Sequence, residues 1–220
     1  MVFQSETRQE IHHFKICQKI RIDVLEKRRD CVSGFNVLLG LSKKIKNGAK
    51  NMAKILMIIA PERFRDEEFF IPKEEFEKAG HETFIASTKI GVCKGSRGGS
   101  TTADLLFNNI NPEAYDAVVF VGGGGSKLLF NDPDALNIAT KMNKKVKVVS
   151  AICLAPVILA NAGVLQGKNA TVSGQEAKTI ESKGAKYTGP GVTVDGNIIT
   201  GNAPKSSRLF GQKICELLKY

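Results

Sequence analysis

The feature that most constrains this chain is a regular alternation of fully apolar segments with amphipathic helical ones. Residues 55–60 read Ile-Leu-Met-Ile-Ile-Ala, a second apolar run follows at 117–121, and a mostly apolar run that includes Lys147 and Ser150 follows at 146–151. An unbroken apolar run of this length is typical of a parallel β-strand that is buried on both faces. Because helical patterns separate these runs, the alternation predicts a mostly parallel sheet with helices covering both of its faces.

Local signals place the remaining elements. Apolar residues at helical spacing, followed by a Gly80 cap, predict a helix over about 66–79. A strand is predicted at 82–87, and the glycine-rich segment 91–99 is predicted to form a loop or a hairpin. The other predicted elements are helices over about 133–142, 153–162 and 205–218, a short strand at 170–172, and a hairpin over 192–200 with its turn at Asp195-Gly196.

The first 51 residues lack this order, and we treat them as a basic amino-terminal extension of one α/β domain that spans 52–220. Residues 1–50 hold 11 Lys/Arg against 5 Asp/Glu, whereas the rest of the chain holds 21 against 17. The extension is either a disordered or loosely helical appendage, or it lies before a true translational start at Met52. Since the domain itself is only mildly basic, we do not expect nucleic acid as a partner.

Composition restricts the class of protein further. The five cysteines, Cys17, Cys31, Cys93, Cys153 and Cys215, contain no CxxC pair, which indicates reduced thiols and a cytoplasmic protein. With three histidines in the whole chain, a histidine-based metal site is not expected, and no motif implies a cofactor. No apolar run approaches the roughly 20 residues of a membrane helix, so no membrane partner is expected.

Cys153 is the candidate nucleophile, because it follows the third apolar strand directly and precedes a helix. In open parallel sheets, ligands bind outside the carboxyl ends of the strands. Backbone amides at the start of the helix would stabilise a thiolate there and lower the pKa of the thiol. The alternative is that Cys153 is a small buried apolar residue, as most free cysteines are.

Two further features lie at the same edge of the predicted sheet. The run Gly122-Gly123-Gly124-Gly125 can bring bare backbone N–H groups close to a developing oxyanion, although glycine runs also form plain flexible loops. It matches neither the phosphate loop nor the dinucleotide fingerprint. Glu68, near the start of the first helix, is either a functional carboxyl or a solvated group that interacts with the helix dipole.

Several of these residues carry a resemblance to a known family. They are Ala151-Ile152-Cys153 with Pro156, Gly122-Gly123, and Glu68 four residues before Pro72. In order and spacing they resemble the PfpI-type intracellular protease family of the DJ-one superfamily, and the resemblance covers about 53–218. It implies a flavodoxin-like three-layer α/β/α sandwich with a cysteine on a nucleophile elbow. It also implies a homo-oligomer, either a dimer or a ring of dimers.

The resemblance also implies roles for individual residues. Cys153 corresponds to the family nucleophile and Glu68 to the protonated glutamate that holds its thiolate. Gly123 and the amide of Leu154 correspond to the oxyanion-binding groups. Gly122 and Ser173 would line the site.

The chain departs from the family pattern at both places where a histidine would stand. Leu154 follows the cysteine directly, and Ser173 occupies the position of the histidine in the other branch of the family. A Cys-His mechanism of peptide hydrolysis therefore lacks its base. We expect instead a thiolate that attacks small carbonyl compounds of the glyoxal type, or damaged adducts, with Glu68 transferring protons.

Three alternatives stay open at this point. The protein could be a non-enzymatic redox sensor or a chaperone-like stress protein, with Cys153 oxidised to a sulfinate. It could be an intracellular cysteine peptidase despite the missing histidine. It could also be an interaction module that works through its basic arm.

Overall fold

The computed structural model describes residues 52–219, which form a central seven-stranded sheet. In spatial order the strands are β11 (Val192–Asp195), β12 (Ile198–Gly201), β8 (Val148–Ile152), β7 (Ala117–Phe120), β1 (Lys54–Ile58), β3 (Glu82–Ser87) and β6 (Leu105–Leu106). Neighbouring strands are parallel throughout, except that β11 runs antiparallel to β12. The mostly parallel sheet predicted from the apolar runs is therefore confirmed.

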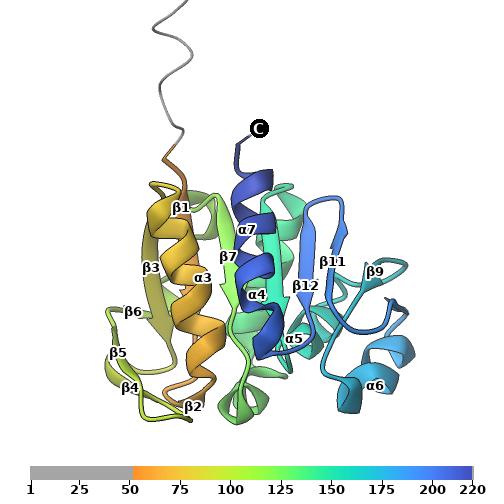
Figure 1. Ribbon diagram of the computed structural model, residues 1–220, viewed down its shortest axis with the longest axis horizontal. Helices are drawn as coiled ribbons and strands as arrows, with labels where there is room; N and C mark the ends of the chain where they lie inside the picture. The colour runs from red at the N-terminus through yellow and green to blue at the C-terminus, as the bar shows by residue number, and fades with distance from the viewer. Residues whose placement is uncertain (1–51, 220) are drawn as a thin grey trace, which may run out of the picture. The chain divides into compact units, whose positions relative to one another are not determined.

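Helices cover both faces of this sheet, as Figure 1 shows. One face is covered by α3 (Asp66–Lys78) and α7 (Ser207–Leu217), which pack against each other. The opposite face is covered by α4 (Pro133–Lys144) and α5 (Pro156–Asn161), and α6 (Ala177–Ser182) packs beside α5. The molecule is thus a three-layer α/β/α sandwich, in agreement with the expected fold class.

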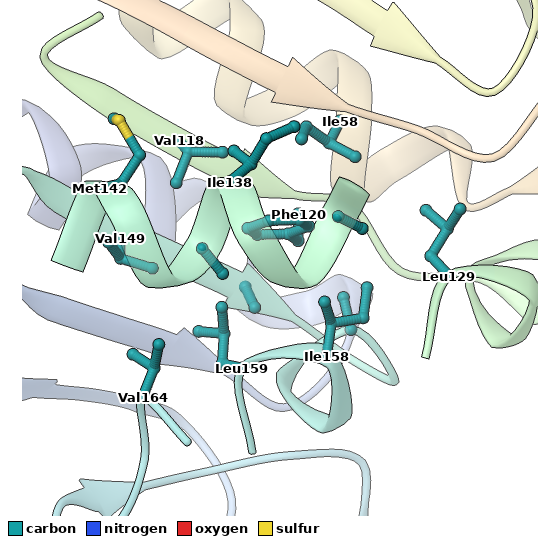
Figure 2. Close-up of a cluster of buried hydrophobic side chains, with 14 of the residues drawn as sticks. Ile58, Val118, Phe120, Leu129, Ile138, Met142, Val149, Ile158, Leu159 and Val164 are labelled. Atoms are coloured by element: carbon teal, nitrogen blue, oxygen red, sulfur yellow. The ribbon is translucent and has the colours of Figure 1, made fainter. Parts of the chain in front are cut away.

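The alternation of side chains along β1 explains why both faces are buried. Leu56 and Ile58 point into one apolar cluster with α4 and α5, part of which is drawn in Figure 2. Ile55 and Met57 point into the other cluster, which includes the inward faces of α3 and α7. Since successive residues of a strand face opposite sides of the sheet, a run buried on both sides has to be apolar throughout.

A second, smaller sheet lies beside the start of α3. It consists of β2 (Glu62–Phe64), β4 (Gly91–Gly95) and β5 (Ser100–Ala103), and the antiparallel pairing of β4 with β5 confirms the predicted hairpin. Asp66, the first residue of α3, accepts hydrogen bonds from the backbone N–H groups of Arg97 (2.8 Å) and Gly99 (2.6 Å). These charge-assisted bonds fix the hairpin tip against the helix.

Short elements complete the described chain. A separate parallel pair is formed by β9 (Asn169–Ala170) and β10 (Lys186–Tyr187). The 3₁₀ helices are η1 (Phe107–Asn109), η2 (Pro112–Ala114), η3 (Gly124–Leu129), η4 (Gly174–Glu176) and η5 (Pro204–Ser206). Within the part of the chain that the structure describes, no helix is long and apolar enough to cross a bilayer.

Several predicted boundaries are wrong: α5 begins at Pro156 and not at Cys153, β9 is Asn169–Ala170 and not 170–172, and β8 begins at Val148 and not at Val146. The backbone N–H groups of Val146 and Lys147 bond to carbonyl oxygens of Asn143 and Met142, so both residues belong to the turn that ends α4. Val146 has a φ of 57° and is 75 % exposed. The apolar side chain of Val146 fits the pattern of a buried strand, but the strand begins only where backbone pairing with β7 begins, at Val148. The extension predicted for residues 1–51 lies outside the described residues.

Candidate active site

Cys153 lies on a tight turn between β8 and α5, where its φ of 63° falls in the left-handed region. This conformation is costly for a residue other than glycine and persists only where the surroundings enforce it. The backbone N–H of Cys153 donates to the carbonyl oxygen of Gly201 at 2.9 Å, and its own carbonyl accepts from the N–H of Ser173 at 2.7 Å. The predicted strand-to-helix elbow is therefore present, and two other segments fix it.

Glu68 lies in the first turn of α3 and is fully buried. Neither carboxyl oxygen has a hydrogen-bond partner of good geometry among the described residues. Burial disfavours the charged form and raises the pKa of Glu68 from 4.5 to about 7, while the nearby Cys153 thiol, the Arg65 charge and the Gly122 backbone lower it. Glu68 is thus not the solvated helix-start carboxylate that was the alternative interpretation.

Gly122 is the point at which Glu68 and Cys153 come together. A Cβ atom at this position would overlap Oε2 of Glu68 and would lie 2.7 Å from the Cβ of Cys153 and 2.6 Å from the carbonyl oxygen of Ile152. Only glycine leaves room for such a close approach. The glycine run that follows β7 is therefore a packing requirement of the site, which the interpretation as a flexible loop does not explain.

The thiol of Cys153 does not show the low pKa that the sequence suggested. Burial and the negative charge of Glu68 raise its pKa to about 12, while the backbone amides of Gly123 and Leu154 act in the lowering direction. The two amides thus lower the thiol pKa as expected, but desolvation and repulsion by the Glu68 carboxylate raise it by more. A low thiol pKa requires Glu68 to be protonated.

Cys153 and Glu68 are best described as one titrating pair, because each group changes the proton affinity of the other. The pair loses a first proton near pH 7, where burial raises the pKa of Glu68, and keeps the second up to about 12, the pKa of Cys153. Between these values it holds one proton and one negative charge. Transfer of that proton between the sulfur and the carboxyl oxygen leaves the net charge of the pair unchanged.

The raised pKa of Glu68 predicts that this carboxyl destabilises the fold at alkaline pH. An unfolded Glu68 loses its proton near 4.5, whereas the folded one keeps it until about 7, so stability falls as the pH rises through this interval. Glu68→Gln, which stays neutral, should raise the free energy of unfolding at pH 8 by about 3 kcal/mol over wild type. Urea unfolding at pH 8 and at pH 4 measures the difference. It should vanish at pH 4, and an equal gain at both values would contradict the assignment.

The other predicted site residues lie around the elbow in different ways. Leu154 contributes its backbone amide, while its side chain is buried in the protein interior. Ser173 contacts the elbow through its backbone N–H, and its side chain is partly exposed. His81 is the only histidine between residues 52 and 219, and its Nδ1 accepts a hydrogen bond from the N–H of Ala53 at 3.2 Å. Ala53 precedes β1, so His81 lies at the amino ends of the parallel strands, whereas Cys153 lies at their carboxyl ends.

Two arginines near the site were missed by the sequence analysis. The backbone N–H of Arg65 donates to the carbonyl oxygen of Gly122 at 3.1 Å, which joins the start of α3 to the glycine run. Its Nε lies 2.8 Å from Oε2 of Glu67. Arg63 has a φ of 58°, and its guanidinium group lies against Gly124. The available signal was their place between an apolar strand and a helix, at the sheet edge where ligands bind.

Other features of the described chain lie apart from this edge. A hollow of about 500 Å³ is lined by Ala53, Asp116, Val148 and Leu217, among others, at the amino ends of β1 and β8. It is therefore not part of the candidate site. Among residues 52–219, no group of three or more His, Cys, Asp or Glu side chains is arranged to hold a metal ion.

The fold and the site together define a class: three-layer α/β/α proteins in which a cysteine on a strand-to-helix elbow lies beside a buried glutamate and a glycine run. The chain belongs to the DJ-1/PfpI family, whose model matches residues 53–217.

Relatives and solved structures agree with this assignment. The deglycase PfpI of Pyrococcus furiosus is 35 % identical over 166 residues, which are 76 % of this chain and 99 % of the relative. An uncharacterised protein of Methanocaldococcus jannaschii is 42 % identical over 81 % of this chain and 88 % of its own length. The crystal structure of a ThiJ/PfpI domain protein from Brachyspira murdochii has a TM-score of 0.74 at 36 % identity, covering 76 % of this chain and 96 % of that one.

Proposed function

We propose that this protein is a cysteine-dependent enzyme that acts on glyoxal-type aldehydes or on the adducts that they form. The observation that carries the proposal is the fully buried Glu68 carboxyl, which interacts directly with Cys153 on its strained elbow. A strongly shifted acid beside a nucleophile is typical of a functional site. Relatives that are named deglycases, including one from Escherichia coli at 29 % identity, support the proposal.

The first chemical step follows from the shared proton. The sulfur of Cys153 adds to the aldehyde carbon while its proton passes to the Glu68 carboxylate, so an S–C bond forms and the carbonyl π bond opens. The amides of Gly123 and Leu154, which already act on the sulfur, would stabilise the oxyanion that develops. Glu68 then returns the proton to this oxygen, and the product of the step is a hemithioacetal.

The overall conversion of a glyoxal-type compound needs no external oxidant or reductant. One water molecule is added, the aldehyde carbon is oxidised to a carboxylate, and the neighbouring carbonyl is reduced to a hydroxyl group. The product is a 2-hydroxy acid. Electrons and hydrogen atoms are therefore redistributed within the substrate. For the addition step, the protein has to supply only the Cys153 nucleophile and the Glu68 carboxyl that transfers its proton.

The alternative functions receive less support from the geometry. Peptide hydrolysis by a Cys-His pair needs a histidine at the elbow, and His81 lies at the opposite edge of the sheet. Oxidation to a sulfinate follows thiolate character, and the raised pKa of Cys153 disfavours the thiolate whenever Glu68 is ionised. A homo-oligomer and a cytoplasmic location stay predictions.

Turnover of methylglyoxal tests the proposed function directly. Purified protein should consume the aldehyde and release lactate, measured by chromatography, and Cys153→Ser prepared identically should not. Cys93→Ser is the matched control, because Cys93 is another free cysteine that is buried in β4. Equal consumption by wild type and Cys153→Ser, or none by either, would overturn the proposal.

A further inference from the structure

Arg63 has a backbone conformation that directs its side chain to an unusual place. It is the middle residue of β2, and the pairing of β2 with β4 is irregular between Glu62 and Phe64. Its φ of 58° is left-handed, which is costly for an arginine. An irregularity of this kind re-aims a side chain, and such features are over-represented beside active sites.

The guanidinium group of Arg63 lies over the surface of the glycine run. A Cβ atom added to Gly124 would lie 3.2 Å from Nη2 and 3.5 Å from Cζ of Arg63. Gly124 is exposed, whereas the preceding Gly123 is buried and directs its amide at Cys153. The Arg63 guanidinium therefore lies at the surface beside Gly124. Gly124 directly follows Gly123, whose backbone amide acts on the Cys153 sulfur.

The charge of Arg63 is not neutralised by the described chain. Glu62 pairs with Lys89 (3.7 Å), and Glu67 pairs with Arg65 (2.8 Å). Between residues 52 and 219, Arg63 itself forms no ion pair with a carboxylate. Above about pH 7 the Cys153–Glu68 pair carries one negative charge, which would repel an anionic ligand. An exposed, unpaired arginine at this position offsets that repulsion.

We propose that Arg63 and the exposed edge of the glycine run bind a carboxylate carried by the carbonyl compound at Cys153, so that the site binds anionic carbonyl compounds more tightly than neutral aldehydes. A guanidinium group matches a carboxylate with two parallel N–H donors. The inference rests on the proposed function for its substrate, but the preference for an anion at this place can be measured without turnover.

Alkylation of Cys153 by an anionic and a neutral reagent distinguishes the effect of the reagent's charge from the intrinsic reactivity of the thiol. Iodoacetate and iodoacetamide form the same S–C bond and release the same iodide, and they differ in that iodoacetate is an anion. The rate at Cys153 is followed by mass spectrometry of its peptide, which excludes the other cysteines. The measured quantity is the ratio of the iodoacetate rate to the iodoacetamide rate.

Arg63→Gln should lower this ratio about three- to tenfold at low salt, and the effect should shrink at high salt. Arg63→Lys keeps the charge and should stay within about twofold of wild type. Lys144→Gln removes an exposed charge at the carboxyl end of α4, at the far edge of the sheet, and should change nothing. An unchanged ratio in Arg63→Gln, or an equal fall in Lys144→Gln, would overturn the proposal.

Competition with turnover provides the second arm. Glyoxylate has no second carbonyl that the internal conversion could reduce to a hydroxyl group, so it is used as a competing anion and not as a substrate. Arg63→Gln should raise the glyoxylate concentration that halves glyoxal turnover about three- to tenfold and leave kcat/KM for glyoxal within about twofold. If glyoxal is not consumed, the proposed function fails while the alkylation ratio still decides the role of Arg63. If glyoxal is consumed but the substitution leaves inhibition by glyoxylate unchanged, the anion site fails and the proposed function stands.

Discussion

Replacing Glu68 by glutamine is expected to lower kcat/KM for methylglyoxal at pH 7.5 by about 100-fold or more. Glutamine has nearly the same shape but cannot accept the proton of the Cys153 thiol, and general acid–base groups contribute about 10²–10⁴-fold. In wild type, kcat/KM should rise with pH through about 7, where the pair loses its first proton. The variant should lack this rise, because the group that titrates there is gone.

The behaviour at high pH distinguishes two roles of Glu68. Without the carboxylate charge, the thiol pKa of Glu68→Gln should fall below the value of about 12, so activity should partly recover near pH 10. Thiolate absorbance at 240 nm against pH measures this pKa. Glu68→Leu has no hydrogen-bond donor, and its thiol should titrate higher than that of Glu68→Gln. If Glu68→Gln kept full activity and only Glu68→Leu lost it, Glu68 would be a donor and not a base.

The second large effect is expected at Gly123, where alanine should destabilise the protein by at least about 3 kcal/mol. Gly123 has a φ of 97°, which alanine rarely adopts. An added Cβ would lie 2.5 Å from the backbone nitrogen of Arg65 and 2.6 Å from the carbonyl oxygen of Arg63. These are backbone atoms and cannot rotate away, so the start of α3 or the glycine run has to move.

Gly124→Ala is the matched control for this substitution. The three atoms nearest to its Cβ would all belong to the Arg63 guanidinium, the closest of them 3.2 Å away at the end of a flexible side chain, and its φ is not in the positive range. We expect a change of less than about 1 kcal/mol in urea unfolding. Similar losses in both variants would show that general rigidity of the run matters, and not the close approach at Gly123.

Much of the fold could be predicted because hydrophobic periodicity decides burial. The run at 55–60 has to be apolar throughout, since β1 is central in the sheet and covered on both faces. The hairpin of β11 and β12 likewise follows from local turn residues. The short strand β2 and helix α6 were missed, because three- to six-residue elements depend on pairing or packing that the local pattern does not display.

The candidate site was predictable in its members but not in its electrostatics. The places of Cys153, Glu68 and the glycine run at the carboxyl ends of the strands follow from the sequence pattern, whereas Gly123 was singled out only by the family resemblance. The direction of the thiol pKa does not, because it depends on the depth of burial and on a carboxyl that lies close in space and far away in sequence. The position of Arg63 was hidden for a similar reason, since an irregular strand pairing places its side chain.

The two backbone bonds that fix Cys153 also have a consequence for the order of folding. They join the elbow to Gly201 and Ser173, which come late in the chain, so the strained turn can be enforced only after these distant segments have docked. A partly folded intermediate in which β12 is unpaired would release the turn and expose an ordinary thiol. The alkylation rate of Cys153 would then report the docking of β12 and of the segment around Ser173, separately from the formation of helices.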